Sequence, residues 1–166
     1  KPFGIPTNYE PQESGIPCYF IQRIGRKFAK SVDILDKGYL NKWKFIAPKS
    51  PIAGQTDFTS AVAFYSNRNT VIAKPGEACT ESFIVLGAFD TEKEAQYFKS
   101  YIFTKTVRFL LLQAVVSQDV TKDNFCFIPD LGTYDRIYTD EYLRELWCIT
   151  DPAECEYIDS RIREIE

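Results

Sequence analysis

Short apolar blocks alternate with polar segments that carry proline or glycine through the first half of the chain. Blocks of this length that are rich in aromatic and β-branched residues predict strands. In the first half we expect four strands, at residues 18–25, 42–50, 70–73 and 82–86. A later block, "NFCFIP" at residues 124–129, predicts one more strand. Residues 1–17 have the proline and glycine content of a loop.

The pattern changes to helical spacing after the fourth of these blocks. Thr91 and Glu94 have the spacing of a capping box, and Asp90 is an alternative cap. Apolar residues then recur at intervals of three and four. The sequence therefore predicts one long helix that ends near Val116.

Two shorter helices are predicted to close the chain. Thr139 is placed to cap the first, and Glu141 falls in its first turn. Asp151 is placed to cap the second, with Pro152 at the first helical position. Strands and helices are mixed without a regular strand–helix–strand alternation, which favours the α+β class. We expect small mixed sheets packed on a long central helix, followed by the two closing helices.

The composition indicates a folded chain whose overall charge does not attract nucleic acid. The 166 residues fit one domain, with room for two lobes. Hydrophobic residues make up 45% of the chain and aromatic residues 15%, which argues against global disorder. The formal net charge is −3, so binding to a nucleic acid would need a locally basic surface.

Residue types that are scarce narrow the chemistry. The 5 cysteines are odd in number and scattered, which favours a reducing, cytoplasmic location over a disulfide framework. Histidine is absent, which removes the commonest general base and the commonest zinc ligand, so no metal site is expected. No apolar run reaches membrane length. Methionine is also absent, and we expect the chain to be a piece of a longer protein.

Patterns typical of enzymes are missing from the sequence. No glycine-rich phosphate loop follows a predicted strand, and a Ser–His–Asp or Cys–His arrangement is impossible without histidine. No predicted strand carries an acid-x-Lys triplet of the kind used by metal-dependent nucleases. The piece is therefore not expected to be an enzyme by itself, and no catalytic residue is assigned.

Three polar loops each carry a cation and are candidates for contacts with nucleic acid. Hydroxyl, amide and basic side chains are the types that contact phosphates and base edges. The candidates are Lys49, Ser50 and Gln55 in the loop after the second strand, Arg68 in the turn at residues 66–70, and Lys122 in the loop at 117–124. The alternative for each is an ordinary polar loop.

The stretch "KSYIFTKTVRFLLL", residues 99–112 of the predicted long helix, carries three cations without an acid among them. Lys99 is expected in solvent, whereas Lys105 and Arg108 are neighbours on another side of the helix. Leu110 to Leu112 lie close to Arg108 in the sequence, so its charge needs a partner. That partner is either an internal acid, such as Glu81 or Asp90, or a bound anion. Lys105 and Arg108 therefore complete the set of candidate DNA contacts.

Several stretches together resemble a known family. The most specific is "ACTESFIVLGAFDTEKEAQYFKSYIFTKTVRFLLL", in which a Cys-Thr-Glu strand block leads into a helix. "PFGIPTNY", "KWKFIAPKS", "FCFIPDL" and "YTDEYLRELWCIT" follow the same family in order. In these stretches the chain is similar to the C-terminal target recognition domain of bacterial restriction–modification enzymes that methylate adenine at N6.

The resemblance implies sequence-specific recognition of double-stranded DNA by a single domain at residues 1–166. Methyltransferase and nuclease domains would lie N-terminal to it, outside this chain, and the parent would be a type II restriction enzyme or adenine-specific DNA methyltransferase. Such a parent would use S-adenosylmethionine and Mg²⁺, whereas this piece would hold no cofactor. The alternative is a protein-interaction domain that docks the catalytic lobes and makes little contact with DNA.

Overall fold

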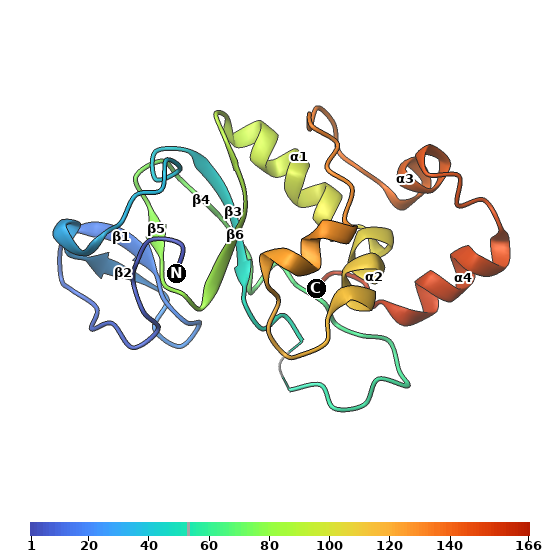
Figure 1. Ribbon diagram of the computed structural model, residues 1–166, viewed down its shortest axis with the longest axis horizontal. Coiled ribbons are helices and arrows are strands. Elements are labelled where there is room, and N and C mark those ends of the chain that lie inside the picture. Colours follow the sequence, from blue (N-terminus) through green and yellow to red (C-terminus); the bar gives the residue numbers. More distant parts are fainter. Residues whose placement is uncertain (53) are drawn as a thin grey trace. The chain divides into compact units, whose positions relative to one another are not determined.

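The computed structural model describes residues 1–52 and 54–166, and the chain divides into two compact units (Figure 1). Residues 1–49 and 69–95 form the first, which we call the sheet unit. Residues 50–68 and 96–166 form the second, which we call the helical unit. Both helices and small sheets are present, so the predicted α+β class is confirmed.

The first sheet of the sheet unit contains one antiparallel and one parallel strand pair. Its strands are β1 (Ile16–Tyr19), β2 (Arg26–Ala29) and β5 (Ala78–Cys79), in the order β2-β1-β5. β2 runs antiparallel to β1, and β5 runs parallel to it. The predicted strand at 18–25 was too long, because the chain leaves β1 after Tyr19 and turns back into β2. β2 and β5 were not predicted.

The second sheet is antiparallel and agrees more closely with the sequence pattern. Its strands are β3 (Trp43–Pro48), β4 (Val71–Ala73) and β6 (Phe83–Phe89), in the order β4-β3-β6. A short 3-10 helix, η1 (Ser31–Asp33), lies between the two sheets in sequence. The core of the sheet unit contains buried side chains from both sheets and from the first five residues: Phe3, Ile5, Cys18, Phe20, Ala29, Ile46, Ala73, Ala78 and Cys79.

One charged side chain is enclosed in this unit. Lys44 on β3 is fully buried, and its Nζ donates hydrogen bonds to the carbonyl oxygens of Leu40 (2.7 Å), Lys42 (2.6 Å) and Lys74 (3.0 Å). Burial lowers the pKa of the Lys44 amine to about 8, although the charge of Glu77 acts in the opposite direction. The three carbonyl oxygens satisfy every N–H of the ammonium group.

The predicted long central helix is wrong, because the helix is broken in the middle. α1 (Glu92–Phe103) and α2 (Lys105–Ala114) are separated by Thr104, which has an extended backbone. The Thr104 hydroxyl accepts a hydrogen bond from the Val107 amide at 3.2 Å, as an N-cap does. The start of α1 is as predicted, since the Thr91 hydroxyl oxygen accepts the Glu94 amide at 3.2 Å.

A distant carboxylate also holds the break in the helix. Asp140 Oδ2 accepts the Lys105 amide at 3.1 Å, and Oδ1 accepts the Thr106 amide at 2.7 Å. These are the first two amides of α2, which have no partner within the helix. Arg144 Nη2 lies 3.8 Å from the same carboxylate and 2.7 Å from Asp159, so ion pairs and hydrogen bonds together join three helices.

The two closing helices are confirmed, whereas the late strand is not. α3 (Asp140–Leu146) is capped by Thr139, and α4 (Pro152–Arg161) is capped by Asp151. The segment predicted as a strand at 124–129 instead contributes to a 3-10 helix, η2 (Lys122–Phe127). A capping box between Thr121 and Asn124 starts this helix, so local hydrogen bonding overrides the apolar pattern.

Candidate functional site

Two of the three polar loops meet in the helical unit. The Ser50 hydroxyl donates a hydrogen bond to Asp119 Oδ1, although the two residues are 69 positions apart. Ser117 closes the second loop by donating its hydroxyl to the Asp119 carbonyl at 3.1 Å. The chain therefore brings the loop after β3 against the loop after α2.

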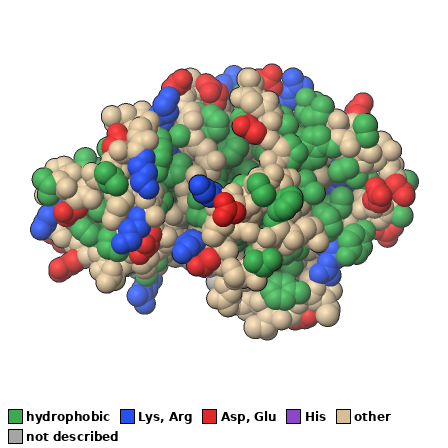
Figure 2. Space-filling view, viewed as in Figure 1, with side chains coloured by type: hydrophobic (Ala, Val, Ile, Leu, Met, Phe, Trp, Pro, Cys, Tyr) green, Lys and Arg blue, Asp and Glu red, His purple; other side chains and the backbone are tan. Residues whose placement is uncertain are grey.

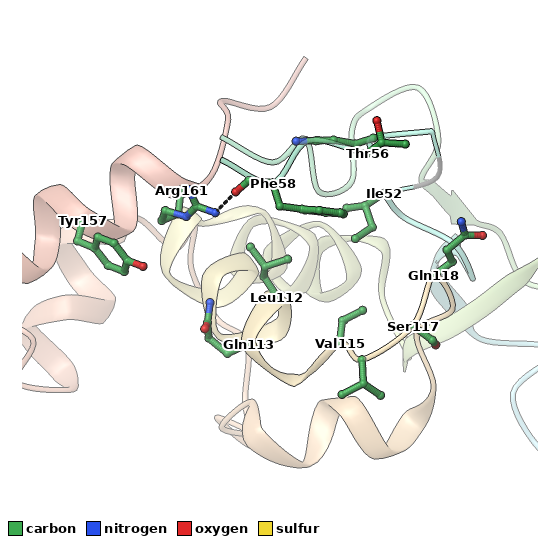
Figure 3. Close-up of a pocket in the computed structure, with 12 residues that line it drawn as sticks. Ile52, Thr56, Phe58, Leu112, Gln113, Val115, Ser117, Gln118, Tyr157 and Arg161 are labelled. Atoms are coloured by element: carbon green, nitrogen blue, oxygen red, sulfur yellow. Dashed lines mark hydrogen bonds between the residues drawn. The ribbon is translucent and has the colours of Figure 1, made fainter. Parts of the chain in front are cut away.

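A cleft with a volume of about 690 Å³ lies beside this meeting point (Figure 3). In Figure 3, Ile52 and Phe58 lie on one side, and Leu112 and Val115 lie on the other. Thr56, Gln113, Ser117 and Gln118 add hydrogen-bonding groups to this apolar lining. Gln113, Ser117 and Gln118 are exposed, so their side chains are available to a ligand.

An internal network of hydrogen bonds shapes the first loop. Gln55 Nε2 donates to the carbonyl oxygens of Asp57 (2.9 Å) and Ala61 (3.3 Å), and Gln55 Oε1 accepts the Ala63 amide at 3.2 Å. Asp57 accepts the amide and hydroxyl of Thr59 at 2.9 and 2.6 Å, and these bonds hold the pKa of Asp57 below its usual range. Gln55, a predicted contact, thus braces the loop with its amide.

The C-terminal segment fixes the outer part of this loop. Arg161 donates to the Thr59 carbonyl at 3.1 Å and to the Phe58 carbonyl, and Arg163 Nε donates to the Ala61 carbonyl at 3.0 Å. The Arg163 amide also donates to the Val62 carbonyl at 2.9 Å. The loop therefore presents Phe58, 46% exposed, from a well-supported backbone.

Arg108 contacts neither an anion site nor either of the expected acids. It is 1% exposed, and all its hydrogen bonds recorded within the described residues go to carbonyl oxygens. Nε donates to Phe103 at 3.1 Å and to Thr104 at 3.3 Å, and Nη1 donates to Phe64 at 3.3 Å and to Arg163 at 2.8 Å. Burial lowers the pKa of Arg108 to about 10, against the opposing charges of Asp140 and Glu164.

The acids expected to pair with Arg108 have other partners. Glu81 Oε1 accepts the Thr7 amide at 3.2 Å, and Asp90 forms an ion pair with Lys42 at 2.5 Å. Both hypotheses for Arg108 were therefore wrong, because backbone carbonyls satisfy the guanidinium. Arg108 joins the start of α2 to two segments distant in sequence, which makes it a structural residue.

The remaining candidate contacts are scattered. Lys105 is mostly buried, and its Nζ lies 2.6 Å from Glu164 Oε1. Lys49 is exposed in the sheet unit, and its amide donates to the Ser82 carbonyl at 2.9 Å. Arg68 and Lys122 are exposed in the helical unit, where Lys122 begins η2. Of the seven candidates, only Gln55 lines the cleft, and Ser50 lies beside it through its bond to Asp119.

Charge is divided unevenly between the two units. The sheet unit has eleven Lys and Arg against nine Asp and Glu, a net charge of +2. The helical unit has nine against fourteen, a net charge of −5. Six of the seven predicted contacts therefore lie in the more acidic unit. This division could not be predicted from the sequence, because the sheet unit is assembled from two separate segments.

Comparison with protein-family models, curated proteins and solved structures finds no match to this chain. Within residues 1–52 and 54–166, no helix is both long and apolar enough to span a membrane. The same residues contain no group of three or more His, Cys, Asp or Glu side chains arranged to hold a metal ion.

Most residues that line the cleft were not among the sequence candidates, and two of these are polar residues on helices. Gln113 lies near the end of α2, where the sequence suggested only the end of an apolar helix. Arg161 lies in the last turn of α4, where a cation is expected simply because it suits the helix dipole. Neither position carries a sequence signal for binding, and only the fold places both beside the loop at 52–58.

Proposed function

We propose that this chain is a sequence-specific recognition module for duplex DNA from a restriction–modification enzyme. The observation that carries the proposal is the cleft in the helical unit, where two loops meet and present amide and hydroxyl side chains. Amide side chains pair with adenine in the major groove, and hydroxyl groups accept or donate to several base edges. The sequence resemblance stated above supports the same function.

The cleft has features that favour sequence-specific binding of DNA over nonspecific binding. The loop at 52–63 is braced by Gln55 and by the arginines of the C-terminal segment, so little ordering is needed on binding. The lining combines apolar groups such as Leu112 and Val115 with amides, which suits base edges and thymine methyl groups. Gln113 and Gln118 are the side chains best placed to read bases.

The catalytic steps belong to other parts of the proposed parent. Methylation would require S-adenosylmethionine, cleavage would require Mg²⁺, and both would take place in domains N-terminal to this module in a bacterial cytoplasm. The module would bind the target and hold it in place while the methyltransferase domain extrudes the adenine from the stack. We assign no catalytic residue to this chain.

Replacing Gln118 with alanine is expected to relax sequence preference at one base pair of the target. A lost bidentate amide contact costs about 1–3 kcal/mol of discrimination against the wrong base. The measurement is selection from a pool of short duplexes with a randomised centre, followed by sequencing of the bound fraction. Gln96→Ala, which removes an exposed amide from α1 outside the cleft, is the matched control.

Two results would count against DNA recognition. The first is that the wild-type chain enriches no sequence over the starting pool. The second is that it binds no duplex even at low salt. If a motif were enriched but remained the same in Gln118→Ala and Gln113→Ala, the function would stand and the cleft would lose its role.

A second function, docking of a protein segment, is favoured by a groove between α2 and α4. This groove has a volume of about 480 Å³ and is lined mainly by apolar side chains, including Phe109, Leu110, Ile149 and Ile158. Residues 130–160 around it carry nine Asp and Glu against two Lys and Arg. An apolar groove with an acidic surround suits a basic amphipathic helix.

Docking predicts that a helical peptide with leucines on one face and lysines on the other binds the chain. Leu110→Asp should weaken this binding about tenfold, because it places a charge in the apolar groove. Val32→Asp is the control, since Val32 is an exposed apolar residue of the sheet unit. Titration calorimetry measures both, and equal changes of affinity in the two variants would show that the groove makes no specific contribution to peptide binding.

A further inference from the structure

The turn between β1 and β2 presents two exposed polar residues on a backbone closed by hydrogen bonds. The Phe20 amide donates to the Gly25 carbonyl at 2.9 Å, and the amides of Ile24 and Gly25 donate to the Ile21 carbonyl at 2.8 and 3.0 Å. Gly25 has φ +76°, which a residue with a side chain rarely adopts. Gln22 and Arg23 occupy the centre of this closed turn, and both are exposed.

The same hairpin carries cations that have no acidic partner. Arg23, Lys27 and Lys30 are exposed, and none of them forms an ion pair within the described part of the chain. Arg26 is different, because its Nη2 lies 2.8 Å from the buried carboxylate of Glu77. Arg26 therefore secures β2, while its neighbours leave their charges open to solvent.

The surrounding segment is basic. Residues 1–49 contain nine Lys and Arg against four Asp and Glu. Two of the four acids are engaged within the chain: Asp33 accepts the Tyr9 hydroxyl at 2.6 Å, and Asp36 accepts three backbone amides, with Gly38 the nearest at 2.8 Å. Figure 2 shows Lys and Arg side chains over the part of the molecule where Figure 1 labels β1 and β2, with acidic groups between them.

We propose that the β1–β2 hairpin contacts the major groove of duplex DNA, with its turn at the base edges and its strand cations on the phosphates. Arg23 has the chemistry to bind guanine with two hydrogen bonds, and Gln22 the chemistry to bind adenine. Lys27 and Lys30 would neutralise backbone phosphates. This inference rests on the proposed function and names a contact surface that lies in the basic unit.

A simpler explanation accounts for only part of the pattern. β2 lies at the edge of its sheet, and lysine on an edge strand discourages pairing with other chains. That explains Lys27, but it does not explain an arginine and a glutamine side by side in a turn. Turn centres favour Gly, Asn, Asp and Pro, so these two residue types are not selected by turn geometry.

The test compares two double variants by selection from a pool of short duplexes with a randomised centre. Gln22→Ala/Arg23→Ala should lower discrimination at one or two base pairs about tenfold to a hundredfold, with the rest of the motif retained. Lys27→Gln/Lys30→Gln should retain the motif and weaken binding to every sequence. Its log–log dependence of affinity on salt should become shallower by about 2, roughly one for each lost phosphate contact.

Arg136→Ala is the matched control, because it removes one guanidinium from the acidic unit, where Arg136 pairs with Asp135 at 2.9 Å. If the wild type enriched a motif and both hairpin variants retained its preference and its salt dependence, the hairpin proposal would fail and DNA recognition would stand. If the wild type bound duplexes without any motif, DNA recognition would fail, and only the lysine variant would then report on phosphate contact. Absence of all binding would overturn both proposals.

Discussion

Replacing Arg108 with alanine is expected to lower the free energy of unfolding by about 3–5 kcal/mol. The guanidinium donates to four carbonyl oxygens from three parts of the helical unit. Its removal leaves the Phe64 and Arg163 carbonyls without this donor and opens a space in a buried region. Urea unfolding followed by far-ultraviolet circular dichroism measures the loss.

Two further variants identify the cause of the loss. Arg108→Lys retains the charge but cannot reach the same set of carbonyls with one ammonium group, so it should recover only part of the stability. Lys99→Ala is the control, because it removes a half-buried cation whose Nζ lies over the Phe103 ring at 5.0 Å, and it should cost less than about 1 kcal/mol. An Arg108→Ala protein as stable as the wild type would contradict a clamping role.

The buried amine of Lys44 makes a contribution to stability that increases at alkaline pH. Its pKa is lowered from 10.5 to about 8 in the folded chain. Between these two pH values this amine binds more protons in the unfolded chain than in the folded chain, so its contribution to the free energy of unfolding increases with pH. The gain contributed by this group is about 3 kcal/mol across the window, and it is lost again as the pH falls to 8.

Comparison with Lys44→Met isolates this effect. Burial raises the pKa of Cys18, Cys79 and Tyr101, which lowers the stability of the folded chain as the pH rises, but these groups are present in both proteins and cancel in the difference. The difference in unfolding free energy between the wild type and Lys44→Met should therefore shift in favour of the wild type from pH 8 to pH 10. A difference that stays flat would mean that the three carbonyl oxygens hold the ammonium at its ordinary pKa.

The sequence pattern predicts elements well where the chain decides its own structure locally. β3, β4 and β6 coincide with apolar blocks, and the caps Thr91, Thr139 and Asp151 lie where their spacing placed them. These strands are short apolar blocks, and the helices have their first amides satisfied by nearby side chains, so both signals are local in the sequence. These elements account for the confirmed fold class.

The predictions fail where a residue distant in sequence determines the local structure or the partner of a side chain. The break at Thr104 depends on Asp140, which lies 35 positions after Lys105. The helical spacing of apolar residues continues across Thr104, so the local pattern predicts an unbroken helix. Arg108 has a similar dependence, since Phe64 and Arg163 are 44 and 55 positions away. Every residue has a backbone carbonyl, so a sequence cannot show which carbonyls will bind an arginine. A buried arginine such as Arg108 is therefore expected to pair with an acid even when carbonyl oxygens satisfy it.

The candidate site shows the same division. The residue types of the cleft loops were recognisable, and Ser50 does meet the second loop through Asp119. The sequence did not show which cations face solvent and which stabilise the fold. Lys105, for example, pairs with Glu164, which is distant in sequence and lies near the chain end. Residues 18–25 were predicted as a single strand, and the turn between β1 and β2 was therefore overlooked.

The attachment of the cleft loop to the C-terminal segment has a consequence for folding. The bonds from Arg161 and Arg163 to this loop join residues 102 positions apart or more, and Val62 pairs with Ile162 alongside them. Contacts of such high sequence separation form late, because closing a long loop costs entropy before any contact is gained. The cleft should therefore be absent from early folding intermediates and should form only after the C-terminal segment has been synthesised.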